Sequence, residues 1–530
     1  MKHAISLILG AGLLLMVSFG CRKESDALME YDHNEELVFN SAESSFAAKF
    51  NIIWNGMNQY YALWDFEAQH GIDWDAVYDT YYPKFLALDQ RGENETVTDE
   101  ELKSLLGEVL NPLHDSHFHI DVYNHKTGST VTCSPSSARV VERDDFNAAK
   151  GVTLHLGYYA NPENGEVETD ADGNPIALTC STEAVSLINA RLASPGTLAH
   201  WIIDRIAELE ALQSPTDLEA FQLQQLYDLK EGLRSINGVA LAEGLDIYNK
   251  LQAKYSFLNI PDFDYIDPAF VGGAGVTLKF ALLKGNIAYL GLSSFSLTTF
   301  FDEQECAKAF DMSQPFTQKL VAQMKAVWQG WFDSIQTLHK AGTLGGVIID
   351  LRSNGGGHMD DSQYVVGALT PGDYIHFGYQ RFKRGTGRYE YSPMMEAHVI
   401  TMSQPHEIIT DVPVVVMVNC ISVSMSETSA LCAKTLPNGT IIGKRSFGAI
   451  CALTGNSDHS YNYAGYIGEE GVTPVFGYLP SMASFTLDGK IIESEGLTPD
   501  IEVDLDIDQF KANGRDTQLD RALQFIRTGQ

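Results

Sequence analysis

Hydrophobic positions in the first part of the chain recur at helical spacing. Segments 46–65, 73–88 and 97–113 carry apolar residues three and four positions apart, the period of a helix with one buried face. Asp73 and Thr98 stand at the start of two of these segments, where short polar side chains cap helix N-termini. The pattern predicts a helical N-terminal segment.

From about residue 275 short apolar runs alternate with helical patterns. "VTLKFALLKGNIAYLGLSSFS" predicts two strands joined by a Gly-Asn turn, and the long helical pattern that follows is interrupted by Pro315. Then come the strand "GGVIIDLR", the helix "MDDSQYVVGAL", the strand "VPVVVMVN", the helix "SETSALCAKTL" and the strand "TIIGKR". Continuous Val/Ile strands alternating with helices indicate a sheet covered on both faces. The predicted fold class is α/β, a helical N-terminal segment plus an α/β core with a largely buried sheet.

Changes in composition divide the 530 residues into segments, and this length favours two or three domains. The predicted segments are an apolar leader (1–21), a polar tether (22–44), the helical N-terminal segment (45–120), a middle region of strands and then helices (121–270), the α/β core (271–510) and a C-terminal helix (511–530).

The leader has the order of a secretory signal. Lys2 and His3 precede an apolar run over 4–19, which is too short and too early for a spanning helix. The run ends in "SFGC", which resembles the lipobox of bacterial lipoproteins, although Ser18 replaces the usual leucine. The resemblance implies a lipid anchor on Cys21 and export to the bacterial cell envelope, facing the periplasm or the cell surface. An ordinary signal peptide cleaved nearby is the alternative.

Charge and cysteine content exclude several classes of function. Acidic residues outnumber basic ones by 69 to 36, for a net charge of −33, and such a surface repels nucleic acid. Six cysteines follow Cys21 without a C-x-x-C pair, which argues against a zinc or redox site. A Cys133–Cys180 disulfide and buried thiols are both open alternatives.

Two loops after predicted strands carry candidate chemistry. The first, "DLRSNGGGHMDD" (350–361), exposes backbone N–H groups that could bind an oxyanion; a tight turn is the alternative, and a phosphate cradle lacks its Gly-Lys-Ser/Thr. The second, "VNCISVSMSETSALC" (418–432), places a serine hydroxyl near a helix N-terminus, where the helix dipole favours a negatively charged oxygen. A simple helix cap is the alternative for this serine.

These two loops belong to a longer series of blocks that resembles a known family. "GNIAYLGLSSFS", "GGVIIDLRSNGGG", "VPVVVMVNCISVSMSETSALCAK", "TIIGKRSFGA" and "EGLTPDIEVD" are similar to the ordered blocks of the tail-specific (C-terminal processing) peptidase superfamily, over most of 275–510. The resemblance implies a catalytic α/β core and a serine peptidase that cleaves peptides or unfolded proteins through an acyl-enzyme, without a cofactor or metal. Many members carry a PDZ-like domain at the place of 121–270, where no clear PDZ pattern is found.

The resemblance also assigns a nucleophile and a base. In the pattern S-x-S-x-S-E the middle serine, Ser424, is the nucleophile, and the other serines are structural. One branch of the superfamily uses a lysine 25 residues later, which falls here on Ala449; Lys444 lies five residues too early. The tricorn-core branch instead takes a histidine from an N-terminal Ser-His block, which here is Ser116–His117.

Other residues of the tricorn-core layout follow from the same resemblance. Glu493 stands three residues before Gly496 of "EGLTPD" and would support the base together with Ser116, ahead of the nearby Glu495. The oxyanion donors would be the N–H of Met425 and that of Gly356, or of a glycine next to it. A metal cluster of His114, His117 and His119 is an alternative reading of the histidine block.

A second function from another class stays open at this point. The retinoid-binding proteins of animal retina resemble this fold, so the chain could be a non-catalytic peptide- or lipid-binding envelope lipoprotein. Such a scaffold would be expected to lose its Ser, His and Glu together, and all three are present. The partners implied are a peptide or protein substrate and a membrane contacted through the lipid anchor, with no nucleic acid. Cleavage specificity and oligomeric state leave no signal in the sequence.

Overall fold

The computed structural model describes most of residues 42–135 and 269–530 and few of residues 136–268. The described residues are 39, 42–92, 95–115, 117–135, 155–158, 177–179, 206–207, 209–214, 223, 227, 269–273, 276–384, 387–451, 465–506 and 516–530. The leader, the tether and most of 136–268 lie outside them. The chain forms two compact units, the first made of 1–138, 379–395 and 451–485 and the second of 139–378, 396–450 and 486–530.

The helices of the first unit arise from the N-terminal pattern. They are α2 (Phe46–Tyr60), α3 (Trp64–Gln69), α4 (Trp74–Asp89) and α5 (Asp99–Leu110). The Asp73 carboxylate accepts from the N–H groups of Asp75 and Ala76, and the Thr98 hydroxyl accepts from Glu101 N–H, so both caps form at the expected places. The helical N-terminal segment is confirmed.

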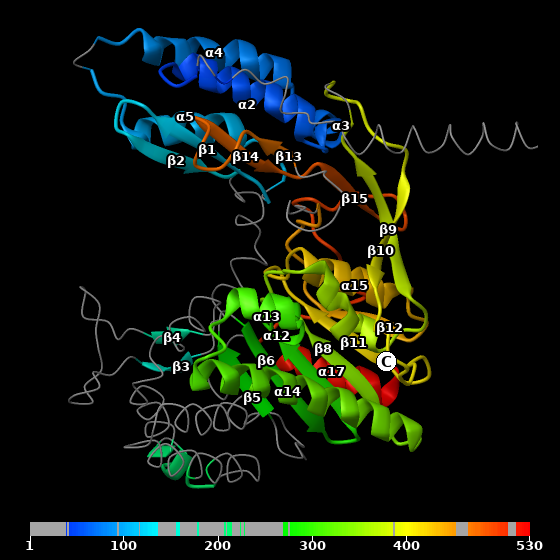
Figure 1. Ribbon diagram of the computed structural model, residues 1–530. Helices are drawn as coiled ribbons and strands as arrows, with labels where there is room; N and C mark the ends of the chain where they lie inside the picture. Colours follow the sequence, from blue (N-terminus) through cyan, green and yellow to red (C-terminus); the bar gives the residue numbers. More distant parts are fainter. Residues whose placement is uncertain are drawn as a thin grey trace, which may run out of the picture. The chain divides into compact units, whose positions relative to one another are not determined.

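A four-stranded antiparallel sheet completes the first unit. Its order is β13 (Gly465–Ile467), β14 (Val475–Leu479), β1 (His119–Asn124) and β2 (Ser129–Cys133). Helix α2 packs on β13 and β14, and α5 packs on β2 (Figure 1). In β1 the buried residues Ile120, Val122 and Asn124 alternate with more exposed ones, as expected for a sheet covered on one face.

The second unit is built on a seven-stranded sheet. The strand order is β16-β12-β11-β8-β7-β6-β5, parallel from β16 to β7 and antiparallel from β7 to β5. The bounds are β5 Ala269–Gly273, β6 Val276–Leu283, β7 Ile287–Leu292, β8 Gly346–Asp350, β11 Val414–Val418, β12 Gly439–Gly443 and β16 Ile501–Glu502. Gly285 and Asn286, both with positive φ, form the predicted turn between β6 and β7.

Helices cover both faces of this sheet. Alternate residues of β11 belong to two separate cores: Val414, Val416 and Val418 to one, Val415 and Met417 to the other. The first core is closed by α14 (Pro315–Lys340) and α15 (Met425–Thr435), and the second by α17 (Thr517–Thr528), as Figure 1 shows. Since full burial of one such side chain contributes about 1.5–3 kcal/mol, the two cores dominate the stability of this unit. The predicted α/β class with a buried sheet is confirmed.

The remaining described elements are short or connect the two units. Strands β9 (Tyr374–Phe382), β10 (Met395–Ile400) and β15 (Met482–Thr486) form a three-stranded sheet of order β10-β9-β15, and each strand carries the chain from one unit into the other. Strands β3 (His155–Tyr158) and β4 (Ala177–Thr179) pair with each other, and helices α12 (Thr298–Phe301) and α13 (Glu303–Ala309) follow β7.

One predicted helix differs from the structure. Residues 359–369 form two 3₁₀ turns, η2 (Met359–Tyr364) and η3 (Val366–Ala368), instead of an α-helix. A Cβ on Gly367 would lie 2.8 Å from the Ser362 carbonyl oxygen and 2.9 Å from that of Ile400, so the chain is packed there more tightly than helical periodicity indicates.

The structure shows the state of the cysteines, and the presence or absence of membrane-spanning helices, for the described residues only. There Cys133, Cys306, Cys420, Cys432 and Cys451 are buried thiols and none forms a disulfide with another of these. The Cys133–Cys180 alternative involves Cys180, which lies outside the described residues, so that pairing stays a prediction. No helix in the described part of the chain has the length and hydrophobicity to cross a membrane.

Candidate active site

The two candidate loops lie side by side at one edge of the seven-stranded sheet. Strands β8 and β11 are adjacent and parallel, with Asp350 opposite Met417 at their carboxyl ends. The glycine-rich loop begins at Asp350, the last residue of β8, and the serine loop begins at Val418, the last residue of β11. Sites in α/β proteins tend to lie at this edge, because the loops that follow neighbouring parallel strands meet there.

Two of the three alternating serines are fixed inside this edge. Ser422 Oγ donates to the Leu351 carbonyl at 2.8 Å, and Ser426 Oγ donates to the Asn354 carbonyl at 2.9 Å. Both serines are fully buried. Their hydroxyls therefore join the serine loop to the glycine-rich loop, which is a structural role.

Ser424, between them, has a different environment. It is partly exposed and occupies the N-cap position of α15, with φ 56° and ψ −114°. A non-glycine residue seldom adopts a positive φ, and such strain concentrates at functional sites. A serine on a sharp strand-to-helix turn presents its hydroxyl in the manner of a nucleophile elbow.

The Glu427 carboxylate holds this turn in place. Fully buried, it accepts hydrogen bonds from Ser424 N–H at 3.1 Å and Ala449 N–H at 2.9 Å on Oε2, and from Ser446 Oγ at 2.5 Å and Gly448 N–H at 2.8 Å on Oε1. Burial raises the pKa of Glu427, and the four hydrogen bonds oppose that shift. Position 449, where a lysine base would stand, is therefore bound to the nucleophile turn through its backbone.

The glycine-rich loop contacts the Ser424 turn directly. A Cβ built on Gly356, whose φ is +90°, would lie 2.7 Å from Ser424 Cβ and 3.0 Å from Met425 N. Only glycine fits at this position, and it brings the loop to the helix N-terminus where an oxyanion would be bound.

The two expected oxyanion donors, Met425 N–H and Gly356 N–H, differ in whether they already donate a hydrogen bond within the protein. Among the described residues, no hydrogen bond is formed by Met425 N–H, which points out of the first turn of α15. By contrast, Gly356 N–H donates to Asn354 Oδ1 at 2.8 Å. The Gly356 amide would have to exchange this bond for one to the oxyanion, so its role stays a prediction, with Gly355 and Gly357 as the neighbouring alternatives.

Glu493 lies on the segment that packs against residues 446–450. It is fully buried, and its Oε1 accepts from Ile450 N–H at 2.8 Å. Ser494 N–H donates to the Gly448 carbonyl at 2.7 Å. Glu495, two residues later, is exposed, and the choice of Glu493 as the supporting carboxylate stays a prediction.

Lys444 is occupied away from the Ser424 turn. Its ammonium pairs with Glu502 Oε1 at 2.6 Å and Asp504 Oδ1 at 2.8 Å. Although burial lowers the pKa of Lys444, the two carboxylates raise it further, so the net shift is upward. A lysine that serves as a general base needs the opposite shift.

His117 lies in the first unit, in the loop between α5 and β1. Its ring is half-buried and hydrogen-bonds to the backbone of Cys451, and its N–H donates to Asp115 Oδ1 at 2.8 Å. Burial lowers the pKa of His117, and the bond to Cys451 opposes the shift without cancelling it. The imidazole is therefore neutral at neutral pH, the form that can accept a proton. Ser116 lies outside the described residues.

The other histidines of this block have separate environments. His114 Nδ1 pairs with Glu67 Oε2 at 2.7 Å, whereas His119 stands on the outer face of β1 against Phe476 and Tyr478. In the described residues no group of three His, Cys, Asp or Glu side chains is arranged to hold a metal ion.

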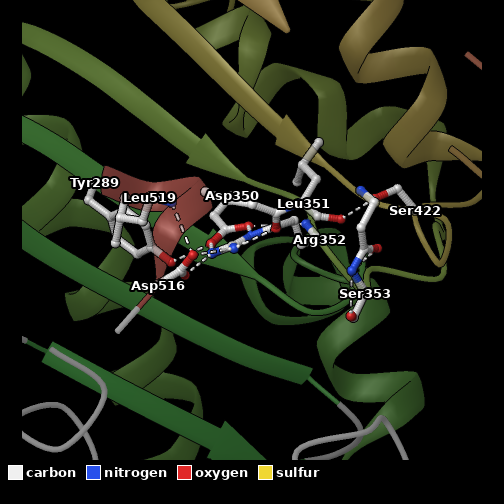
Figure 2. A network of polar contacts seen from close by, with 10 residues as sticks. Tyr289, Asp350, Leu351, Arg352, Ser353, Ser422, Asp516 and Leu519 are labelled. Carbon is white, nitrogen blue, oxygen red and sulfur yellow. Dashed lines mark hydrogen bonds and ion pairs between the residues drawn. The ribbon is translucent and has the colours of Figure 1, made fainter. Parts of the chain in front are cut away.

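A buried ion-pair network fixes the base of the glycine-rich loop (Figure 2). Arg352 pairs with Asp350 at 2.7 Å and with Asp516, which precedes α17, at 2.6 Å, and Tyr289 OH donates to Asp350 at 2.8 Å. Burial disfavours the charge of Arg352, but the two carboxylates raise the pKa of the guanidinium overall. Loss of one partner from such a network typically costs about 3–5 kcal/mol, so α17 helps to hold this loop in place.

Three residues that hold the two loops in place were not identified from the sequence: Asn354, Asn419 and Asp516. Asn354 accepts from Val423 N–H at 3.0 Å and from Ser426 Oγ through its carbonyl, and Asn419 Oδ1 accepts from Ser353 N–H at 2.9 Å. An Asn directly before the triple glycine and another directly after the β11 run are the only signals that could have indicated them. Asp516, 164 residues from Arg352, left none.

Comparison with known protein families identifies one match. Residues 286–503 match the model of Peptidase family S41. A comparison with curated proteins gives no match.

Solved structures of peptidases are similar to the chain at low identity. CPAF complexed with lactacystin is 12% identical, with 92% of this chain and 100% of that chain covered and a TM-score of 0.46. An inferred peptidase from Parabacteroides merdae is 16% identical, with coverages of 92% and 97% and a TM-score of 0.45. The tricorn protease is 18% identical, over 46% of this chain and 18% of its own, with a TM-score of 0.26.

The family match covers both loops, the Ser424 turn and Glu493, the region whose geometry is described above. This part of the chain, residues 286–503, is thus similar to Peptidase family S41, in agreement with the resemblance of its sequence blocks.

Proposed function

We propose that the protein is an endopeptidase that cleaves peptides or unfolded proteins through an acyl-enzyme on Ser424. The observation that carries this proposal is the contrast among the three serines of the loop. Ser422 and Ser426 are buried with their hydroxyls bonded to carbonyls, whereas Ser424 is partly exposed on a strained turn, next to Met425 N–H, which has no hydrogen-bond acceptor in the described part of the chain.

In the proposed reaction Ser424 Oγ attacks the scissile carbonyl carbon while His117 accepts the hydroxyl proton. The tetrahedral oxyanion is stabilised by Met425 N–H and by an amide of the glycine-rich loop. Collapse of the intermediate breaks the C–N bond, and His117 returns the proton to the leaving amine. Water then hydrolyses the acyl-enzyme by the same route, with His117 again as base.

The assignment of His117, Ser116 and Glu493 to the base and its support is part of this proposal, in the manner of the tricorn-core branch. Three observations support it: Ala449 stands at the lysine position, Lys444 is engaged by two carboxylates, and burial keeps His117 neutral.

Labelling with a fluorophosphonate tests the proposal at the level of the residue. The reagent should phosphonylate the full-length protein in detergent, and mass spectrometry should find the adduct on Ser424. Boiled protein is the control, because only an activated serine reacts. A folded protein that takes up no label would favour the non-catalytic peptide- or lipid-binding protein instead.

We further propose that the enzyme is anchored in the bacterial cell envelope by a lipid on Cys21. The apolar run ending in "SFGC" supports this location. A clickable palmitate analogue fed to expressing cells should label the wild type and not Cys21→Ser, with Cys133→Ser as the matched control that keeps the label. Equal labelling of wild type and Cys21→Ser, or none of either, would contradict the anchor.

A further inference from the structure

A buried carboxylate lies beside the loop that carries His117. Glu67, on α3, is fully buried. Its Oε1 accepts from Tyr61 OH at 2.8 Å and from the backbone N–H of His114 at 2.8 Å, and its Oε2 accepts from His114 Nδ1 at 2.7 Å. One carboxylate thus binds both the backbone and the side chain of a residue three positions before His117.

The His117 loop is short and fixed at both ends. Helix α5 ends at Leu110, and β1 begins at His119. Between them Glu67 holds His114, and the buried Asp115 accepts from His117 N–H, the local bond of an Asx turn. The position of His117 therefore depends on the contacts of His114 and Asp115.

Asp115 is a carboxyl group of a different kind from Glu67. Its Oδ1 is bound by His117 N–H, whereas its Oδ2 is buried without a partner among the described residues. Burial, with a smaller contribution from the charge of Glu67, raises the pKa of Asp115 to about 7. Below this pH the protonated form of Asp115 predominates, and the carboxylate that contacts His114 is that of Glu67.

We infer that Glu67 is a positioning residue for the catalytic base, acting through His114 to hold His117 in its reactive place. The inference rests on the proposed function, because it presupposes that His117 is the base. A base must lie within hydrogen-bond reach of the nucleophile, so a small displacement of its loop costs rate without changing how substrate binds. The expected signature is a fall in kcat at nearly constant KM.

Four variants of the full-length protein distinguish a role of Glu67 in positioning His117 from a role in stabilising the fold alone. Glu67→Gln removes the charge that binds His114, and His114→Ala removes the Nδ1 donor. His114→Asn keeps a donor at the place of Nδ1 and is the conservative rescue. Glu101→Gln is the matched control, since it removes a carboxylate of the same unit that pairs on the surface with Arg91.

Steady-state kinetics on a fluorogenic peptide, with thermal melting to select folded variants, are the measurement. Glu67→Gln and His114→Ala should lower kcat at least tenfold, which corresponds to about 1.4 kcal/mol, and change KM less than twofold. His114→Asn should keep kcat within about threefold of wild type, and Glu101→Gln should be unchanged. If Glu67→Gln does not fold, the comparison of His114→Ala with His114→Asn carries the test alone.

Other outcomes would overturn the inference. His117→Ala, measured in parallel, shows whether the role of Glu67 alone fails or the proposed function fails as well. Wild-type kcat in folded Glu67→Gln, or equal losses in His114→Ala and His114→Asn, with His117→Ala inactive, would remove Glu67 as a positioning residue and leave the proposed function intact. Wild-type activity in His117→Ala would remove both.

Discussion

Ser424→Ala is expected to abolish peptide hydrolysis while leaving the protein folded. Removal of the nucleophile from a serine peptidase lowers kcat by a factor on the order of 10⁶. The fold should tolerate the change because Ser424 is bound to Glu427 through its backbone N–H, which alanine keeps. The positive φ at this residue disfavours alanine only slightly more than serine, so the melting temperature should change by a few degrees at most.

The flanking serines are the matched controls for this experiment. In Ser422→Ala or Ser426→Ala a buried carbonyl loses its hydroxyl donor, of Leu351 or Asn354 respectively. Each loss should lower the free energy of unfolding by about 1–3 kcal/mol, and the folded fraction should still hydrolyse peptide. Peptide assays paired with chemical denaturation separate the two effects. An inactive Ser422→Ala or Ser426→Ala beside an active Ser424→Ala would move the nucleophile to another serine.

The elements around the site follow from local patterns of the sequence. Strands β8 and β11 are uninterrupted apolar runs, and α15 has a serine before it and an early glutamate. These patterns involve residues that are close in sequence. The ends of the two strands, the start of the helix and the positions of the loops could therefore be predicted from the sequence. The S-x-S-x-S-E resemblance then selected Ser424, which the structure places on the turn at the end of β11.

Long-range polar contacts could not be predicted in the same way. Glu67 binds His114 from 47 residues away, and Asp516 binds Arg352 from 164. In the sequence Glu67 lies two residues after the first helical pattern ends, and nothing distinguishes it from carboxylates that face water. Burial decides the difference, and burial depends on how the completed unit packs.

The 3₁₀ turns after the glycine-rich loop show a second limit. The apolar spacing of 359–369 fits a helix, but Asp361 turns inward and accepts from Leu297 N–H and Thr298 N–H at the start of α12. Hydrogen bonds between the Asp361 side chain and another element constrain the backbone around Asp361. Hydrophobic periodicity indicates which residues are buried, but it does not indicate such hydrogen bonds.

His117→Ala is expected to remove most of the activity and to distinguish the proposed Ser/His mechanism from a Ser/Lys one. Loss of the base in triad enzymes lowers kcat by a factor on the order of 10⁶, and the oxyanion donors and substrate binding retain a small residual rate. Glu493→Gln should lose less, because Glu493 would support the base without contacting substrate. Lys444→Met is the control: it should keep wild-type kcat, since Lys444 pairs with Glu502 and Asp504.

The pH dependence of the wild type provides an independent test of the same base. A histidine base works in its neutral form, so kcat/KM should rise as pH increases through the pKa of His117 and then level off. Because burial lowers that pKa, the midpoint should lie below the ordinary histidine value of about 6.5. A lysine base would instead place the midpoint at a more alkaline pH, since its pKa is depressed from about 10.4 and catalytic lysines commonly titrate at about 7–8. An alkaline midpoint together with an inactive Lys444→Met and an active His117→Ala would replace the Ser/His mechanism with the Ser/Lys one.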